Sequence, residues 1–281
     1  MRLTQYEEPG GTRIAAELDD GLHPLDRPAG FGLRQLLLEQ PSTNDLEGML
    51  LDERLGEVEV VAPVNPGKIV AIGLNYLDHI RESGVDPPER PLVFSKFPSA
   101  VIATGEAISF DPGITERVDW EVELGVVIGS RMRHVAEADA LNHVFGYTGV
   151  NDVSARDLQF GDGQWTRGKS LDTFCPVGPV VVTADEIGDP QALGLETRVN
   201  GEIVQDSSTS EMVFGVAEIL SFCFRNFTLE PGDLVVTGTP WGCGEFMDPP
   251  RSLADGDLVE TAVERIGKLS NPVRTKQEDP A

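Results

Sequence analysis

The sequence predicts a β-rich α+β fold. Many short runs are dominated by β-branched, aromatic and other apolar residues, which is typical of strands. Turns that contain glycine, proline or asparagine separate these runs, and only a few stretches carry helical spacing. A chain with many short strands and few helices is expected to form a sheet-rich domain.

The N-terminal segment is expected to form a small α+β domain. Glu8-Pro9-Gly10-Gly11 predicts a hairpin turn between two strands, and helical spacing follows at residues 33–38 and 46–55. Prolines and a glycine then interrupt the chain at residues 63–67. We therefore place the boundary there, between a small domain of residues 1–62 and a larger domain of residues 63–281.

The larger domain is expected to consist mainly of strands, at residues 68–74, 92–96, 118–129, 145–151, 180–183, 195–199, 202–205, 234–237 and 258–264. Helices are predicted at residues 75–82, 136–145 and 208–224. Gly146 is placed to cap the second helix, and Ser208 with Glu211 resembles a capping box on the third. Residues 161–168 are expected to form a loop, and the polar tail from Thr275 is expected to fray.

The most informative strand carries the segment Trp120-Glu121-Val122-Glu123. Side chains alternate between the faces of a strand, so Glu121 and Glu123 point the same way. Two neighbouring carboxylates on a mostly apolar strand repel each other and are costly to bury unpaired. Two interpretations follow: a solvated face with two surface glutamates, or a divalent-cation site in which the ion offsets the repulsion.

The position of Asp152 in the sequence favours the interpretation as a cation site. Asp152 ends the strand-like run that begins at Phe145, and three carboxylates converge if this strand is a neighbour of the strand that carries Glu121 and Glu123. Three carboxylates with water suit Mg²⁺ or Mn²⁺, and the sequence spacing of histidines and cysteines gives no zinc motif. We therefore predict Mg²⁺, or Mn²⁺, held by Glu121, Glu123 and Asp152.

His79 and Glu82 are three residues apart, so on a helix they lie on one face. A carboxylate can orient an imidazole so that the pair takes a proton from water as a general base. A surface ion pair on a helix is the alternative, and spacing alone favours it.

Candidate substrate-binding residues follow Asp152. Arg156 and Gln159 lie four and seven residues further on, so a helix would bring both towards one carboxylate or keto oxygen. For Arg156 the alternative is a salt bridge to the adjacent Asp157. Lys169 follows the expected loop, where a cation could stabilise an enolate or oxyanion beside the metal.

Several long motifs resemble those of the fumarylacetoacetate hydrolase family. They are DWEVELGVVIG, NDVSARDLQ, GQWTRGKSLDTFCPVGP and the turn Thr237-Gly238-Thr239-Pro240. The resemblance runs from about Lys68 to Val273, in the family's order. It implies that the larger domain has the mixed β-sandwich roll of this family, and that the protein forms a homodimer.

The resemblance also implies roles for individual residues. His79 and Glu82 match the H-x-x-E pair that activates the attacking water in the family. Lys169 matches a substrate-binding lysine, and Thr239 matches a threonine that contacts a substrate carboxylate. Lys96 lies in a motif near the family's site, but it is also explained as a lysine at a strand end, so we leave it out of the catalytic set.

Composition excludes several function classes. A formal net charge of −25 argues against binding to nucleic acid or an anionic membrane. No run of about 18 apolar residues predicts a membrane-spanning helix, and the N-terminus lacks the apolar core of a secretion signal. Three scattered cysteines form neither a metal motif nor a disulfide framework, which fits a reducing cytoplasm. The acidity fits either a saline cytoplasm or simply an acidic enzyme.

We therefore expect a metal-dependent hydrolase that acts on a small anionic keto acid. It would cleave the C–C bond of a 2,4-diketo acid, such as an acylpyruvate or a diketo-deoxy sugar acid, to pyruvate and a carboxylic acid. Within the family the same kind of site decarboxylates oxaloacetate, isomerises hydroxy-diene diacids or dehydrates 2-keto-3-deoxy sugar acids, so these alternatives stay open. A catalytically idle protein with a structural metal site is the alternative of another class.

Overall fold

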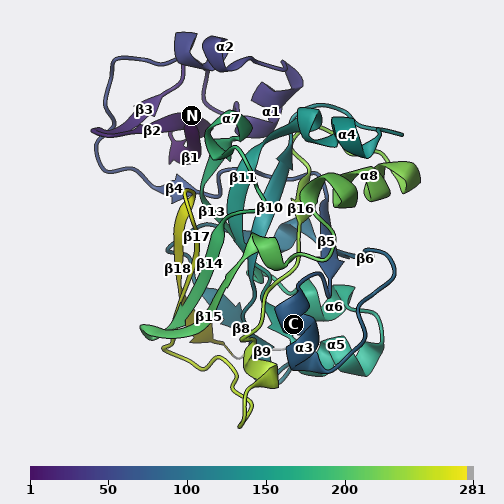
Figure 1. Ribbon diagram of the computed structural model, residues 1–281. Coiled ribbons are helices and arrows are strands. Elements are labelled where there is room, and N and C mark those ends of the chain that lie inside the picture. Colours follow the sequence, from purple (N-terminus) through teal and green to yellow (C-terminus); the bar gives the residue numbers. More distant parts are fainter. Residues whose placement is uncertain (277–281) are drawn as a thin grey trace.

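The structure is a computed structural model that describes residues 1–276, and most of its strands belong to one large sheet (Figure 1). Nine strands form its main path, in the order β3 (Gly21–Pro24), β2 (Gly11–Leu18), β1 (Arg2–Glu8), β13 (Cys175–Thr183), β11 (Val144–Asn151), β10 (Val122–Ile128), β16 (Leu234–Val236), β5 (Ile69–Gly73) and β6 (Leu92–Lys96). Two short strands join it at the side, β4 (Val60–Val61) beside β1 and β7 (Val101–Ile102) beside β13.

A second sheet packs beside the large one. Its order is β15 (Glu202–Ser208), β14 (Gly194–Val199), β17 (Leu258–Val263), β18 (Gly267–Thr275) and β8 (Ile108–Phe110). A two-stranded sheet pairs β12 (Ser154–Ala155) with β9 (Val118–Asp119). These sheets confirm the predicted β-rich α+β fold class.

The helices are short and lie outside the sheets. They are α1 (Leu33–Leu38), α2 (Thr43–Gly48), α3 (Leu77–Ser83), α4 (Glu137–Ala140), α5 (Arg156–Asp162), α6 (Thr166–Lys169), α7 (Ala184–Ile187) and α8 (Val216–Asn226). Single 3₁₀ turns occur at Pro98–Ala100, Leu141–His143, Thr209–Glu211 and Gly244–Phe246. No helix within residues 1–276 is long and apolar enough to cross a membrane.

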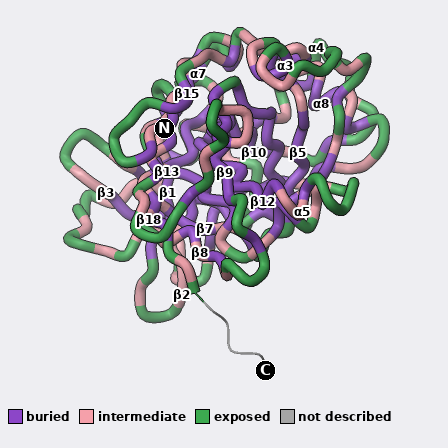
Figure 2. The backbone as a smooth tube through the Cα atoms, turned by 90° about the horizontal axis from the view of Figure 1, so that it is seen from below, coloured by how far each residue is buried: buried purple, intermediate pink, exposed green. Residues whose placement is uncertain are grey.

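The centre of the large sheet is buried on both faces (Figure 2). On β10, Val126 belongs to the apolar cluster that contains the buried face of α8, whereas Val127 belongs to the cluster on the opposite face, which contains α1. This explains why the strand reads as a nearly continuous apolar run. Alternation places Glu123 on the same face of β10 as Val127, so this carboxylate enters a largely apolar layer.

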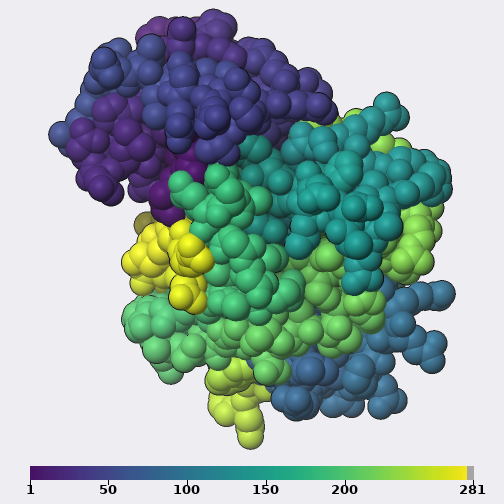
Figure 3. Space-filling view, turned by 45° about the horizontal axis from the view of Figure 1, so that its top comes forward, coloured from purple at the N-terminus to yellow at the C-terminus, as the bar shows by residue number. Residues whose placement is uncertain are grey.

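The N-terminal segment extends the large sheet. Leu3 of β1 pairs with Val181 of β13, and the predicted hairpin joins β1 to β2. Its residues gather in one lobe at an end of the molecule (Figure 3). Whether residues 1–62 fold as a domain of their own stays a prediction.

The helix predicted at residues 208–224 begins later than its apolar pattern indicates. Ser208 accepts a hydrogen bond from the backbone of Ser210 and starts only a 3₁₀ turn. Two backbone N–H groups, those of Val213 and Phe214, then bond to the backbone and side chain of Asn75. These contacts hold the chain out of the helix until Gly215, the N-cap of α8.

The prediction of a helix over residues 136–145, capped by Gly146, is largely wrong. Only α4 and one 3₁₀ turn form there, and Gly146 lies within β11. A Cβ at Gly146 would stand 2.2 Å from the carbonyl oxygen of Val182 on β13, so close strand approach explains this glycine.

Three other predicted elements differ from the structure in their bounds. Residues 46–55 contain only the end of α2, and the expected loop at residues 161–168 contains the start of α6. The strand predicted over residues 118–129 is divided into β9 and β10. The expected fraying of the tail concerns mainly residues 277–281, which lie outside the described residues, whereas Thr275 still pairs with Phe110.

Candidate active site

Strand pairing brings the three predicted metal ligands together. In the antiparallel pair of β10 and β11, Glu123 lies opposite Val150, and the backbone N–H of Asp152 donates to the carbonyl oxygen of Glu121 at 2.8 Å. One oxygen from each of Glu121, Glu123 and Asp152 lies within 4.8 Å of the others, and all three residues are buried. The solvated-face interpretation is therefore wrong, and the chain has an acidic cluster that could hold a metal ion.

Buried cations surround two of the three carboxylates. Lys169 Nζ lies 2.7 Å from both Glu121 Oε2 and Asp152 Oδ2, and Lys96 Nζ lies 2.6 Å from Asp152 Oδ1. Burial opposes ionisation of Glu121, but the charges of Lys169 and Arg156 outweigh it and lower the pKa of this carboxyl to about 2. Burial also disfavours the Lys169 ammonium, but Asp152 and Glu121 outweigh this effect and raise its pKa.

Glu123 differs from its neighbours because it has no ion pair among the described residues. Its Oε2 accepts a hydrogen bond of 2.7 Å from the backbone N–H of Gly238. Burial, followed by repulsion from Asp152 and Glu121, raises the pKa of this carboxyl well above its usual range. A buried carboxylate without a partner, beside two others, fits a divalent cation with oxygen ligands.

The buried charges around the pocket support the same fit. Carboxylates exceed cations by one: Asp119, Glu121, Glu123 and Asp152 face Lys96, Arg156 and Lys169. A divalent cation would give the site a net positive charge, which an anionic substrate could then balance. With a cation bound, the pocket would thus attract an anionic substrate, which the acidic surface of the protein repels.

Helix α5 directs Arg156 into the site. Its guanidinium lies 2.7 Å from Asp119 Oδ2 and 2.6 Å from Glu121 Oε1, and its Nη1 donates to Gln159 Oε1 at 3.0 Å. The alternative ion pair with Asp157 is wrong, because the Asp157 carboxylate accepts from Thr115 instead. Burial disfavours the Arg156 cation, but Asp119 and Glu121 outweigh this and raise its pKa.

The histidine of the histidine–glutamate pair is buried, its glutamate is partly buried, and both are fixed in place. Helix α3 places His79 Nδ1 3.0 Å from Glu82 Oε2, and Glu82 Oε1 accepts from the backbone N–H of Gly242 at 2.9 Å. His79 is 7% exposed, so the pair is not a surface ion pair. The edge of Phe246 packs against the imidazole with ring centroids 5.3 Å apart.

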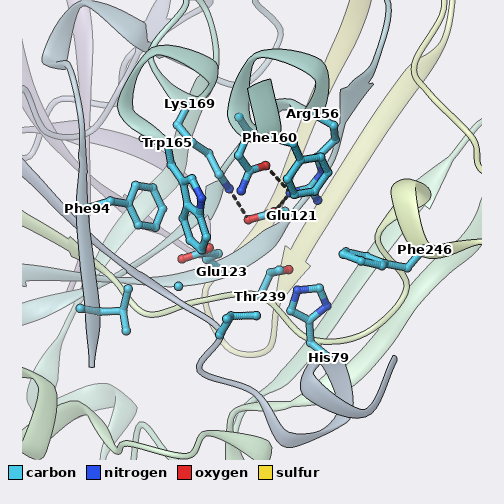
Figure 4. Close-up of a pocket in the computed structure, with 14 residues that line it drawn as sticks. His79, Phe94, Glu121, Glu123, Arg156, Phe160, Trp165, Lys169, Thr239 and Phe246 are labelled. Carbon is cyan, nitrogen blue, oxygen red and sulfur yellow. Dashed lines mark hydrogen bonds and ion pairs between the residues drawn. The ribbon is translucent and has the colours of Figure 1, made fainter. Parts of the chain in front are cut away.

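One pocket connects these groups. It has a volume of about 470 Å³, part of it open to solvent, and is lined by His79, Glu121, Glu123, Arg156, Gln159, Lys169 and Thr239. In Figure 4, Lys169 and Glu121 lie on one side and His79 on the other, with Thr239 between them. Its remaining wall is mostly apolar and includes Phe94, Phe160, Trp165 and Phe246. Asp152 and Glu82 stand behind the pocket and contact it through Lys169 and His79.

A buried glutamine from the second sheet fixes Thr239. Gln205 Nε2 donates to Thr239 Oγ1 at 3.0 Å, while Gln205 Oε1 accepts from the backbone N–H of Val122 at 3.0 Å. Because Thr239 Oγ1 accepts this bond, its own hydrogen is free to be donated into the pocket. The same side chain also holds the strand segment between Glu121 and Glu123.

Sequence reasoning missed or set aside several residues of this site. Lys96, which the sequence also explains as a lysine at a strand end, contacts Asp152 and the carbonyl oxygens of Val153 and Lys169. Asp119 lies two residues before Glu121, so strand alternation was a signal that could have found it. For Gln205, which lies 83 residues from Val122, no local signal existed.

Comparison with known proteins agrees with this architecture. The profile of the family described as fumarylacetoacetate (FAA) hydrolase C-terminal matches residues 68–274. The mitochondrial oxaloacetate tautomerase FAHD2A of Bos taurus is 47% identical over 97% of this chain and 91% of its own length.

Two solved structures extend the likeness to the whole chain. A fumarylacetoacetate hydrolase from Exiguobacterium antarcticum is 37% identical, with a TM-score of 0.88 over 98% of this chain and 100% of that one. A 5-carboxymethyl-2-hydroxymuconate delta-isomerase from Mycobacterium smegmatis is 35% identical, with a TM-score of 0.82 over 98% and 100%. The motifs, the fold and these matches show that the chain belongs to the fumarylacetoacetate hydrolase family of enzymes.

Proposed function

We propose that the protein is a divalent-metal-dependent tautomerase that interconverts the enol and keto forms of a small 2-oxo dicarboxylic acid of the oxaloacetate type. The observation that carries this proposal is the placement of the buried carboxylate–lysine cluster and of His79 on one pocket. The reaction moves one proton between C3 and the 2-oxo oxygen, so it needs stabilisation of oxygen charge and one acid–base group.

The residues of the chain supply both requirements. Lys169 Nζ and the Arg156 guanidinium, both buried, place positive charge where the 2-oxo oxygen becomes negative. His79 is oriented through Nδ1 by Glu82, which leaves Nε2 to give or take the proton at C3. Thr239 donates its hydroxyl hydrogen to a substrate carboxylate.

The donor set suits a hard cation. Only carboxylate oxygens meet at Glu121, Glu123 and Asp152, which favours Mg²⁺ or Mn²⁺ over a softer ion. When bound, the cation supplies Lewis-acid stabilisation of the enolate oxygen. The proposed residues for holding it are the same three as those predicted from the sequence.

Hydrolysis of a 2,4-diketo acid is the second candidate. It is favoured by the fixed His79–Glu82 pair, which could deprotonate a water, and by the apolar wall of the pocket, which could accept an acyl chain. The leaving carbanion would be pyruvate enolate, stabilised by the same cations as in the first proposal. The names of the relatives, a tautomerase and an isomerase beside a hydrolase, support the enolate chemistry that both candidates share.

One assay series separates the candidates. Freshly dissolved enol oxaloacetate is followed by its ultraviolet absorbance, with Mg²⁺ and with chelator, while pyruvate is measured enzymatically in the same samples. Chelator-sensitive loss of the enol without pyruvate supports the tautomerase. Pyruvate with carbon dioxide from oxaloacetate would make the protein a decarboxylase, and pyruvate with a carboxylic acid from an acylpyruvate panel would make it a hydrolase. Cation binding without any turnover would support the alternative of a catalytically idle metal-binding protein.

Two further expectations stay proposals. We infer a cytoplasmic, reducing location, because Cys175, Cys223 and Cys243 are all free and buried. We also infer a homodimer, on the family resemblance alone. Light scattering on the purified full chain tests this, and a monomer mass at assay concentration would contradict it.

A further inference from the structure

Three metal-ligating side chains of different kinds meet beside the carboxylate cluster. His79, Glu82 and Cys243 each offer one ligand atom, and these atoms lie within 4.8 Å of one another. His79 Nδ1 is 3.0 Å from Glu82 Oε2 and 4.0 Å from Cys243 Sγ. We propose that they form a second site, for a borderline or soft divalent cation such as Zn²⁺, and that its occupation inhibits the enzyme.

The separations suit a tetrahedral ion. Zinc lies about 2.0–2.2 Å from nitrogen and oxygen ligands and about 2.3 Å from sulfur, so ligand atoms stand about 3.3–3.6 Å apart. The separations of His79 Nδ1 from Glu82 Oε2 and from Cys243 Sγ, 3.0 Å and 4.0 Å, lie a few tenths of an ångström on either side of this range. The separation of Glu82 and Cys243 is also within 4.8 Å, so binding requires Cys243 Sγ to move closer to both other atoms.

The two clusters have different ligand atoms, so they are expected to prefer different cations. Nitrogen, oxygen and sulfur together favour Zn²⁺, whereas the all-carboxylate cluster favours Mg²⁺ or Mn²⁺. Binding releases the proton of the Cys243 thiol, and a dication with one thiolate and one carboxylate is neutral. Neutrality matters because His79 and Cys243 are buried, where an unbalanced charge is costly.

Neighbouring groups hold this site in place, and its histidine borders the pocket. The second oxygen of Glu82 is held by the Gly242 N–H, and Cys243 Sγ lies 4.0 Å from Gln205 Nε2 and 3.9 Å from the carbonyl oxygen of Pro240. His79 lines the open pocket, while Glu82 and Cys243 lie behind it on the Nδ1 side of the ring, and Glu82 is partly exposed.

Occupation would remove the acid–base group. A cation bound at His79 Nδ1 replaces the hydrogen bond to Glu82 and turns this carboxylate into a ligand, so the pair no longer transfers a proton. This inhibition rests on the proposed role of His79 and Glu82, whereas binding of the ion at the three residues does not.

Cobalt is the probe for the binding step. The full-length protein is titrated with Co²⁺ in excess Mg²⁺, which keeps the carboxylate cluster filled, and thiolate-to-cobalt charge-transfer absorbance is recorded. The test variant is Cys243→Ala, and the matched control is Cys175→Ala. Cys175 is buried near the other cluster: burial raises the pKa of its thiol to about 12, and Lys96 and Asp152 also act on it. It therefore tests whether that cluster produces the absorbance.

We expect the absorbance in the wild type and in Cys175→Ala, and its loss in Cys243→Ala. Its absence from the wild type, or its loss in Cys175→Ala instead, overturns the proposal. If Cys243→Ala does not fold, X-ray absorption of the Zn²⁺-loaded wild type decides, because sulfur must appear among the zinc ligands. A shell of nitrogen and oxygen alone contradicts the site.

The inhibition is measured separately. With Mg²⁺ in excess, Zn²⁺ should inhibit the wild type, and Cys243→Ala should raise the half-inhibiting Zn²⁺ concentration by at least about 10-fold, since even outer-shell partners of a metal contribute that much. Equal inhibition of both proteins excludes the regulatory role. If cobalt binds at Cys243 but no reaction is found, only the proposed function has failed.

Discussion

At the scale of single residues, Glu123 decides the electrostatics of the site. It is the only one of the three clustered carboxylates without an ion pair among residues 1–276, although it is 1% exposed. Its neighbours Glu121 and Asp152 are neutralised by Lys169 and other cations. The uncompensated negative charge is therefore concentrated on one side chain.

Replacing Glu123 should abolish tight cation binding. Glu123→Gln keeps the shape but removes the charge, so affinity for Mg²⁺ or Mn²⁺ should fall by at least about 100-fold, because losing a direct ligand costs more than the 10–100-fold of an outer-shell partner. Calorimetric titration measures this. Glu89→Gln, on an exposed loop, is the matched control. Wild-type affinity in Glu123→Gln would remove this residue from the site.

The same carboxyl should make the metal-free protein less stable as pH rises. Its raised pKa means that the folded state binds the proton more tightly than the unfolded state, so stability falls once pH exceeds the ordinary value of 4.5. The slope attributable to this group is at most about 1.4 kcal/mol per pH unit. Urea denaturation in chelator, from weakly acidic to neutral pH, compares wild type with Glu123→Gln.

The variant cannot titrate at this position, so the difference between the two proteins isolates Glu123. Identical pH dependence would show that the carboxyl is not perturbed. Saturating Mg²⁺ should reverse the wild-type decline, because the cation favours the charged form.

His79 should be needed for proton transfer and not for cation binding. His79→Ala is expected to lower turnover by about 10²–10⁴-fold, which is the usual contribution of a general acid or base. Mg²⁺ affinity should be unchanged, because His79 is not among the three clustered carboxylates. The control is His143→Ala, in a 3₁₀ turn outside the pocket. Normal turnover would exclude the proposed role.

At the scale of elements, two strand contacts place the site. The β10–β11 pair sets Asp152 opposite Glu121, and β15 contributes Gln205 from the second sheet. Gln205 accepts from Val122 and from Thr197 Oγ1 and donates to Thr239 Oγ1. One buried amide thus joins the strand segment of Glu121 and Glu123, the second sheet and the Thr239 turn.

Removing this amide should weaken the fold and the pocket together. Gln205→Leu leaves the N–H of Val122 and the hydroxyl of Thr197 without their acceptor, and each unsatisfied buried group costs about 1–3 kcal/mol. Chemical denaturation should show a loss in this range or above. Gln164→Leu, an exposed glutamine, is the control. In the fraction of Gln205→Leu that folds, KM for the substrate should rise, because Gln205 no longer orients the Thr239 hydroxyl.

At the scale of the whole molecule, the acidic charge opposes the site that it surrounds. A net charge of −25 repels an anionic substrate and destabilises the compact state through self-repulsion. The buried lysines and Arg156 counter this negative charge only locally, at the pocket. Salt should therefore act on stability and on substrate association in the same direction.

Raising monovalent salt should stabilise the protein. The Debye length shortens from about 30 Å at 0.01 M to about 3 Å at 1 M, so repulsion among surface carboxylates is screened. Thermal unfolding in NaCl and in KCl should show the same rise in Tm. A fall in Tm would contradict the self-repulsion argument, and a rise with one salt alone would point to specific ion binding instead.

Local sequence patterns were sufficient to predict much of the structure of this protein. The strands, the shared face of Glu121 and Glu123, and the spacing of His79 and Glu82 follow from periods of two and of about four residues. The hairpin at Glu8–Gly11 follows from its proline and glycines. Local periodicity failed where a distant group competes for the backbone. Asn75 takes the N–H of Phe214, 139 residues away, and thereby delays α8.

The sequence by itself determined the fold class, the family and the residue types of the site, because these depend on short-range patterning and on contiguous motifs. Only the tertiary structure decided which charges meet. Lys96 reaches Asp152 over 56 residues, Gln205 reaches Val122 over 83, and Cys243 reaches His79 over 164. The physical reason is that sheet pairing and packing, which set these contacts, join segments whose separation along the chain carries no local signal.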